Sequence, residues 1–220
     1  MAASKIWPTA KDHLAPATPS GEADHRLANS LSVIAGLVRL KAGRANQIAD
    51  PKTFLLEVAD RIDAVAKLHR HMAHAKHDVV QLGDYLQEIC DSLSRALARP
   101  GTHFTVECPP EVGASFKVAL PLGLIVAELF SNSLKYAHPA GLPAKIALSC
   151  AQVGANGIDF VYEDDGVGFP EGFDVEQDGH LGMRFIRLLS DQLNAERRWE
   201  NTPLGVRFAI TVPPQGNGRA

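Results

Sequence analysis

Apolar residues near the start of the chain recur at helical spacing in two separate segments. The first stripe steps by four, three and four residues through Leu27, Leu31, Ile34 and Val38. The second steps by three, four, three and four through Leu55, Val58, Ile62, Val65 and His69. Both patterns predict amphipathic helices. Residues 43–51 supply the break between them, and Asp50-Pro51 is a typical helix start. A lone hairpin cannot bury both stripes, so we expect two copies to pair as a homodimeric four-helix bundle.

From about residue 78 the pattern changes to helices interleaved with short β-type runs. The predicted strands are Phe104–Cys108, Lys145–Cys150, Ile158–Glu163 and Arg207–Val212. The predicted helices are Leu82–Leu97, Leu120–Ala137 and Leu181–Asn194. This order predicts an α+β protein whose second part is an α/β sandwich, with one sheet covered on one face by helices.

The pattern divides the chain into four segments. Residues 1–19 form a flexible N-terminal segment, 20–77 the helical hairpin, 78–213 the α/β sandwich and 214–220 a flexible tail.

The composition narrows the classes of partner and compartment. The formal net charge of -3 gives no electrostatic case for nucleic acid or a membrane surface. By the sequence pattern no apolar run reaches the length of a membrane span, and the N-terminus lacks the apolar centre of a secretory signal. Three cysteines, Cys90, Cys108 and Cys150, are far apart and odd in number. They predict neither a metal site nor a disulfide framework, and so indicate a reduced, cytoplasmic compartment.

One predicted helix carries a polar face suited to phosphate chemistry. Glu128, Asn132 and Lys135 step by four and three residues and therefore share a face. The amide oxygen of Asn132 can serve as a Mg²⁺ ligand, and the Glu128 carboxylate can take a proton or orient a water. Lys135 offers a positive charge for phosphate oxygens, with the ring of Tyr136 beside it. The alternative is an ordinary amphipathic helix with a solvated polar face.

Two glycine pairs follow in the order that a nucleotide site needs. Asp164 ends a predicted strand, and its carboxylate can accept a hydrogen bond from an exocyclic amine such as that of adenine. Gly166 and Gly168 let the backbone turn sharply and approach a ligand. Gly179 and Gly182 precede a helix whose first N–H groups can bind phosphate. Either pair alone would be interpreted as an ordinary surface turn. Because the two pairs follow the polar helix in this order, the interpretation as a nucleotide site is stronger for both.

His25 is the candidate phosphoryl acceptor. It lies two residues before the apolar stripe and points roughly 150° away from it, so it is expected to be exposed. Imidazole is a competent nucleophile near neutral pH. Asp24 or Glu22 can orient the ring or accept its proton, and Asn29 lies one helical turn later than His25 on the same face.

Together these segments resemble sensor histidine kinases. Residues 126–139, 163–170 and 179–182 look like the N, G1 and G2 boxes of the GHKL ATP-binding domain, and the likeness covers about 78–213. The phrase Asp24-His-Arg-Leu-Ala-Asn29 resembles the HRxxN phosphoacceptor box of kinases close to the HWE group. The resemblance implies a base, a magnesium ligand, nucleotide contacts and pocket glycines at Glu128, Asn132, Lys135, Tyr136, Asp164, Gly166, Gly168, Gly179 and Gly182. Residues 168–179 would form a short ATP lid.

The likeness has one departure. The family usually places Gly-Thr before its last strand, with the threonine near the adenine, whereas here Val206 follows Gly205. The missing hydroxyl would weaken nucleotide binding.

A second group of histidines has two interpretations. His69, His71, His74 and His77 gather at the end of the second predicted helix, and the last three step by three residues. A divalent metal could use that face. A solvated helix C-terminus, which favours cationic side chains, is the preferred interpretation.

The sequence therefore predicts a cytoplasmic two-component histidine kinase. It would use ATP and Mg²⁺ to phosphorylate His25 and pass the phosphoryl group to an aspartate of a response-regulator receiver domain. About twenty residues precede the hairpin, so we expect no sensor domain in this chain. A separate sensor protein would then deliver the signal, or the N-terminal segment and the hairpin would respond to it. The alternative is a histidine phosphotransferase or response-regulator phosphatase with a degenerate ATP-binding domain. An anti-sigma-type serine kinase and a non-catalytic scaffold are further rivals.

Overall fold

The computed structural model describes residues 32, 35–36, 51–74, 79–177 and 181–214. The main sheet has five strands in the order β2-β4-β5-β7-β6. Their bounds are β2 His103–Glu107, β4 Lys145–Val153, β5 Gly157–Asp164, β6 Glu196–Thr202 and β7 Gly205–Val212. Strand β2 runs parallel to β4, and every other pair is antiparallel. A small second sheet pairs β1 (Val79–Gln81) with β3 (Gly113–Ser115).

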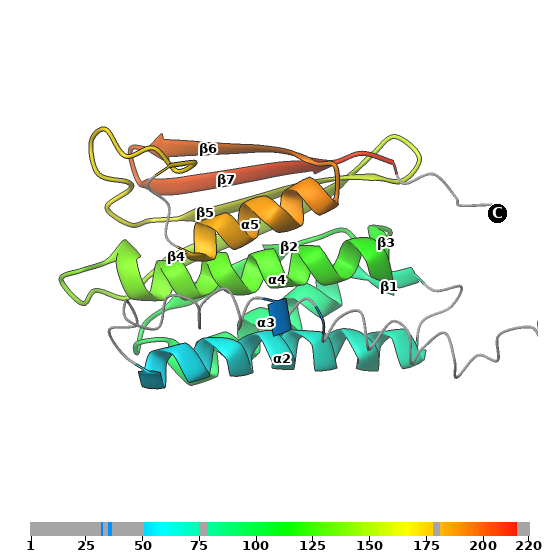
Figure 1. Cartoon of the computed structure of the whole chain (residues 1–220), viewed down its shortest axis with the longest axis horizontal. Helices are drawn as coiled ribbons and strands as arrows, with labels where there is room; N and C mark the ends of the chain where they lie inside the picture. Colours follow the sequence, from blue (N-terminus) through cyan, green and yellow to red (C-terminus); the bar gives the residue numbers. More distant parts are fainter. Residues whose placement is uncertain (1–31, 33–34, 37–50, 75–78, 178–180, 215–220) are drawn as a thin grey trace, which may run out of the picture.

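Helices cover one face of the main sheet (Figure 1). They are α3 (Leu82–Leu97), α4 (Phe116–Asn132) and α5 (Leu181–Gln192), and a π-helical turn, η2 (Ser133–Ala137), continues α4. Helix α4 lies between the sheet and the helix α2 (Pro51–His74), which explains why nearly all of α4 is buried. Alternate sheet residues such as Ile146, Phe160 and Phe208 face the helices and are buried.

Helix α2 packs on the α/β sandwich, a contact that the hydrophobic pattern did not predict. Ala64, Val65 and Leu68 are buried in the same core as α3 and α4. Leu55 and Ile62, from the predicted stripe, are 65% and 47% exposed. The face of α2 that packs on the sandwich therefore includes Ala64 and Leu68 beside Val65, while Leu55 and Ile62 of the predicted stripe lie outside it.

The α+β class and the sheet covered on one face are confirmed. The bounds of α3 match the prediction, and four strands are found within a few residues of their predicted positions. Strand β6 was missed because its sequence, Glu-Arg-Arg-Trp-Glu-Asn-Thr, is mostly charged, as suits an edge strand. Helix α4 begins at Phe116, four residues before the predicted start.

The segment Phe116–Ala137 is long and apolar enough to cross a membrane by length and composition, contrary to the sequence-based expectation. In the structure 83% of its most apolar window is buried inside the protein. A core helix passes the same test, so this is weak evidence for a span.

Candidate functional site

The structure brings Glu128 and Asn132 of α4 against Gly182 at the start of α5. A Cβ at residue 182 would lie 2.9 Å from Glu128 Oε2 and 3.7 Å from Asn132 Nδ2. A side chain at this position would have to displace the end of Glu128, so the glycine lets the N-terminus of α5 lie close to the polar face of α4. The predicted grouping of these three residues is therefore present.

Glu128 has a partner that the sequence analysis missed. Arg61 of α2 forms an ion pair with it through Nη2 and Oε1, and both side chains are almost fully buried. The Arg61 guanidinium also lies 5.7 Å from the ring centroid of Phe185, on α5. Only a tertiary contact could reveal this pair, because the two residues are 67 positions apart.

The Asp164 carboxylate is held at the end of β5 by three donors. Ser133 donates its hydroxyl to Oδ2 at 2.6 Å, and the backbone N–H groups of Gly166 and Val206 donate to Oδ1 at 3.1 and 3.3 Å. The Tyr162 hydroxyl in turn donates to Ser133 Oγ at 2.9 Å. A carboxylate has roughly four acceptor positions, so Asp164 can still accept a bond from a ligand.

The turn after Asp164 packs tightly on η2. A Cβ at Gly166 would lie 2.5 Å from Ala137 Cβ, and Val167 N–H donates to the Ala137 carbonyl at 2.9 Å. Gly168 has φ +75°, a conformation that side chains rarely adopt. Both glycines thus have the backbone role that the sequence predicted.

The backbone of Gly205 and Val206 packs against Asp164. Gly205 has φ +125°, and a Cβ there would lie 2.1 Å from the Asp164 carbonyl oxygen. Val206 lacks the expected hydroxyl, but its backbone N–H still reaches the Asp164 carboxylate. The departure from Gly-Thr therefore removes one side-chain group and leaves the backbone arrangement intact.

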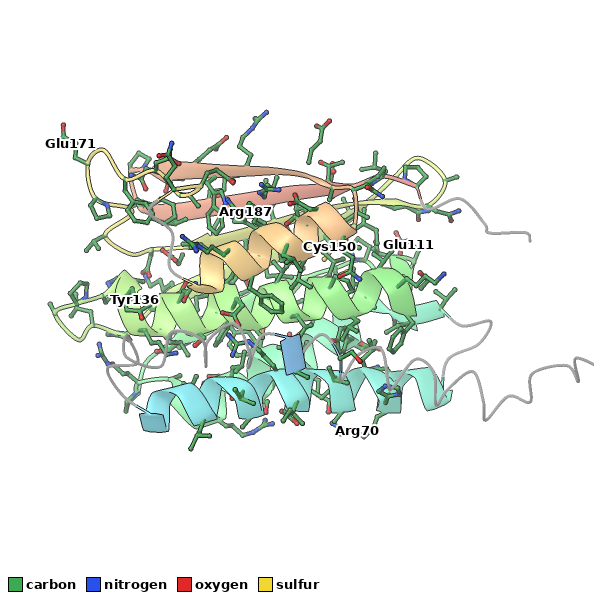
Figure 2. The ribbon with its side chains drawn as sticks, viewed as in Figure 1. Arg70, Glu111, Tyr136, Cys150, Glu171 and Arg187 are labelled. Carbon is green, nitrogen blue, oxygen red and sulfur yellow. The ribbon has the colours of Figure 1, made fainter. Side chains whose placement is uncertain are left out.

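Lys135 and Tyr136 lie in η2 and not in the α-helix that the spacing argument assumed. A π-turn holds more residues per turn, so Lys135 is rotated away from the position that an α-helix would give it. Tyr136 is 60% exposed and lies at the end of this helix in Figure 2.

The predicted lid is anchored at both ends of its described part. Asn201 of β6 accepts a hydrogen bond from Phe169 N–H at 2.8 Å and donates to the Phe169 carbonyl at 3.1 Å. Glu176 pairs with Arg187 and Arg197, each at 3.2 Å. Between these anchors the loop projects from the molecule, with Glu171 at its outer edge (Figure 2). Asn201 was missed because a charged edge strand gives no signal for a lid contact.

The site can be tested for its fit to Mg²⁺. Asn132 and Glu128 supply amide and carboxylate oxygens, the ligand type that Mg²⁺ prefers, beside the open space at Gly182. Within the described ranges no group of three His, Cys, Asp or Glu side chains could hold a metal alone. The residues present fit a magnesium ion held by few protein ligands and by phosphate oxygens.

Several predicted residues lie outside the described part of the chain. They are Asp24, His25, Asn29 and Gly179. Of the histidine group, His71 Nε2 lies at hydrogen-bond distance, 3.0 Å, from Glu88 Oε2 of α3. The His74 side chain and His77 are not described.

A cavity of about 560 Å³ opens beside Asp164, which lines it together with His103, Lys145 and the β6–β7 turn. Glu128, Asn132 and Gly182 do not line it. Of the residues predicted for the nucleotide site, the cavity therefore shares Asp164 alone.

Two cysteines that are far apart in sequence meet in the sheet. Cys108 follows β2, and Cys150 lies on β4, which pairs with β2 in parallel register. The Cys150 thiol donates a hydrogen bond that lowers the pKa of Cys108 below its usual value, and both are free thiols. The spacing along the chain gave no sign of this contact.

The chain is similar in sequence to known histidine kinases. Residues 22–97 match the HisKA_2 family, described as histidine kinase. The chain is 26% identical over 197 residues to blue-light-activated histidine kinase 2 of Erythrobacter litoralis (strain HTCC2594), covering 87% of this chain and 56% of that protein. It is 27% identical over 204 residues to sensor histidine kinase PdtaS of Mycobacterium tuberculosis (strain ATCC 25618 / H37Rv), covering 90% and 40%. The chain thus spans about half the length of these relatives.

Solved structures agree on the fold. The Erythrobacter litoralis EL346 blue-light-activated histidine kinase superposes with a TM-score of 0.77 at 22% identity, covering 93% of this chain and 63% of that one. The ATP-binding domain of PrrB from Mycobacterium tuberculosis superposes with a TM-score of 0.50 at 22% identity, covering 63% and 97%. The predicted resemblance is confirmed at this level: residues 22–97 match the HisKA_2 histidine kinase family, and the rest of the chain has the fold of a histidine kinase ATP-binding domain.

Proposed function

We propose that this chain is a protein-histidine kinase that transfers the γ-phosphoryl group of ATP to His25. The observation that carries the proposal is the meeting of Glu128, Asn132 and Gly182 at one point between α4 and α5. Both relatives named above are histidine kinases, which supports the same activity here.

In this proposal the residues around Asp164 bind the adenine. The fixed carboxylate would accept the exocyclic amine, because Ser133, Gly166 and Val206 hold it in one orientation and leave acceptor capacity. The N–H groups at the start of α5 would bind the phosphates, which the glycine at 182 allows to come close to α4.

Asn132 would hold the magnesium ion together with phosphate oxygens. That ion, when bound, neutralises charge that develops on the transferring group. A nitrogen of His25 would form a bond to the γ-phosphorus while the bond to the ADP oxygen breaks. The imidazole proton would pass to a carboxylate, for which Glu128 and Asp24 are the candidates.

The phosphoryl group would then pass to an aspartate of a response-regulator receiver domain, as the family implies. We further propose that the protein is cytoplasmic and works as a homodimer. The apolar side chains of Leu55 and Ile62 are exposed seven residues apart on α2, which supports pairing with a second copy. We also propose that a separate sensor protein delivers the signal to this chain.

The experiment that tests the kinase proposal is incubation with γ-labelled ATP and Mg²⁺, beside His25→Ala and Asn132→Ala variants. Acid-labile, base-stable label on the wild type, absent from both variants, is the expected result. Label that survives His25→Ala would contradict the acceptor assignment.

Val206 is the one observation that favours the alternative, a phosphotransferase or phosphatase with a degenerate ATP-binding domain. In that case the wild type would stay unlabelled by ATP but would accept phosphate at His25 from a phosphorylated receiver domain. Acid-stable phosphoserine on a partner would instead indicate a serine kinase.

A further inference from the structure

The buried ion pair between Arg61 and Glu128 joins the phosphoacceptor hairpin to the proposed catalytic base. We infer that Arg61 is a positioning residue for Glu128, so that the nucleotide site is complete only while α2 lies on α4. This inference rests on the proposed kinase activity and adds to it a residue from the neighbouring segment.

The first support is the way the Glu128 carboxylate is divided between two partners. Its Oε1 binds Arg61 Nη2, while Oε2 is the oxygen that lies closest to Gly182. By binding one oxygen, the guanidinium fixes the other toward the N-terminus of α5, where the phosphates are expected. An unpaired carboxylate would be free to rotate away.

The second support is that packing alone does not explain an arginine at this position. The side chains of Arg61 and Glu128 are 5% and 9% exposed, so both charges are largely removed from water. A buried ion pair is rarely more stable than apolar side chains of similar size, and Ala64, Val65 and Leu68 already pack α2 on the core. The role of Arg61 therefore lies in its ion pair with Glu128 and not in the volume that its side chain fills.

The third support is that, among the described residues, few other contacts fix the guanidinium of Arg61. Arg61 Nε is buried and has no hydrogen-bond partner in the described part of the chain. The ring of Phe185, three residues after Gly182, lies 5.7 Å from the guanidinium carbon. Arg61 thus contacts α4 and α5 together, at the two elements whose approach forms the site.

The consequence is that catalysis depends on whether α2 is packed on α4. If α2 leaves α4, Glu128 loses the cation that orients it. The proposed kinase would then bind ATP through Asp164 and Asn132 but transfer its phosphoryl group slowly.

The test measures two quantities on the full chain. One is the single-turnover rate of labelling from γ-labelled ATP at saturating concentration, and the other is the affinity for a fluorescent ATP analogue. The variants are Arg61→Met, Arg61→Lys, Glu128→Gln and the Arg61→Met/Glu128→Gln double variant. Arg70→Met is the matched control, because Arg70 lies on the same helix and pairs with Glu88 while 56% exposed.

We expect Arg61→Met to lower the rate about tenfold or more and to change the affinity less than about threefold. Arg61→Lys should recover part of the rate, since it keeps the charge without the fork. In the Glu128→Gln background Arg61→Met should have no further effect. Arg70→Met should match the wild type.

Three results would overturn the inference. They are a wild-type or higher rate in Arg61→Met, a loss confined to affinity, and a full additional loss in the Glu128→Gln background. If Arg61→Met does not fold, Arg61→Lys decides, and a wild-type rate there has the same meaning. No labelling of the wild type would instead refute the proposed kinase activity itself, together with this inference.

Discussion

The Ser133 hydroxyl donates to Asp164 Oδ2 at 2.6 Å, and this contact joins the last turn of the α4–η2 helix to the end of β5. The serine is 4% exposed, so water cannot easily replace the bond. A hydrogen bond to a charged group is worth about 1.5–3 kcal/mol. The orientation of the proposed adenine-binding carboxylate therefore depends on a residue outside the predicted set.

Replacing Ser133 by alanine should lower the affinity for ATP about tenfold, because Asp164 loses the donor that orients it. Isothermal titration with a non-hydrolysable ATP analogue measures the effect. Ser131→Ala is the matched control, since the Ser131 hydroxyl is buried two residues earlier without a hydrogen-bond partner in the described ranges. Equal affinities in the two variants would show that Ser133 has no role in binding.

Gly205→Ala should disrupt the packing of the β6–β7 turn against Asp164. A Cβ would lie 2.1 Å from the Asp164 carbonyl oxygen, and the φ of +125° is strained for any side chain. We expect the free energy of unfolding to fall by about 3 kcal/mol and nucleotide binding to be lost. Thermal unfolding would measure this, with Gly154→Ala as a control at a positive φ in open space. If Gly205→Ala melts no lower than the control, the close approach is not important.

Much of this site could be predicted from the sequence. The residues that were missed were missed for one physical reason. Glu128, Asn132 and the glycine turns were found because their spacing is local to one helix or one turn. Arg61, Ser133 and Asn201 act through contacts between distant segments, which no periodicity records. The same distinction holds for the main sheet, since its four apolar strands were predicted but the charged edge strand β6 was not.

Val206→Thr should raise the affinity for ATP several-fold. The backbone N–H of residue 206 already binds Asp164, so the substitution adds a hydroxyl at the place where the family has one without changing the backbone. One neutral hydrogen bond is worth about 1 kcal/mol, or roughly fivefold in affinity. Titration with an ATP analogue measures it, and unchanged affinity would mean that residue 206 acts through its backbone alone.

Asn201→Ala should loosen the start of the lid. The Asn201 amide makes two hydrogen bonds to the backbone of Phe169, and their loss would raise the open population of the loop about fivefold. Limited proteolysis with chymotrypsin reports on this, because Phe169 and Phe173 lie in the loop. Gln152→Ala is the control, since Gln152 makes a similar side-chain bond to the Ala155 carbonyl in the β4–β5 turn. Cleavage at equal rates in both variants would contradict the anchoring role.

Cys108 should be the most reactive of the three thiols. The hydrogen bond from Cys150 lowers the pKa of Cys108, whereas burial raises the pKa of Cys90 to about 12. Thiolate is the reactive form, so the alkylation rate of Cys108 should rise at lower pH than for an ordinary cysteine. The rate with iodoacetamide, followed from pH 6 to 10 by mass spectrometry of the modified peptide, measures this.

The control for this thiol is removal of its donor. In Cys150→Ala the pKa of Cys108 should return toward its ordinary value, so that the rise in alkylation rate moves to higher pH and the rate near pH 7 falls. Cys90→Ala should leave the profile unchanged, because Cys90 lies buried on α3. If the profiles of Cys150→Ala and the wild type coincide, the two thiols do not interact, and the parallel pairing of β2 with β4 brings them close without chemical consequence.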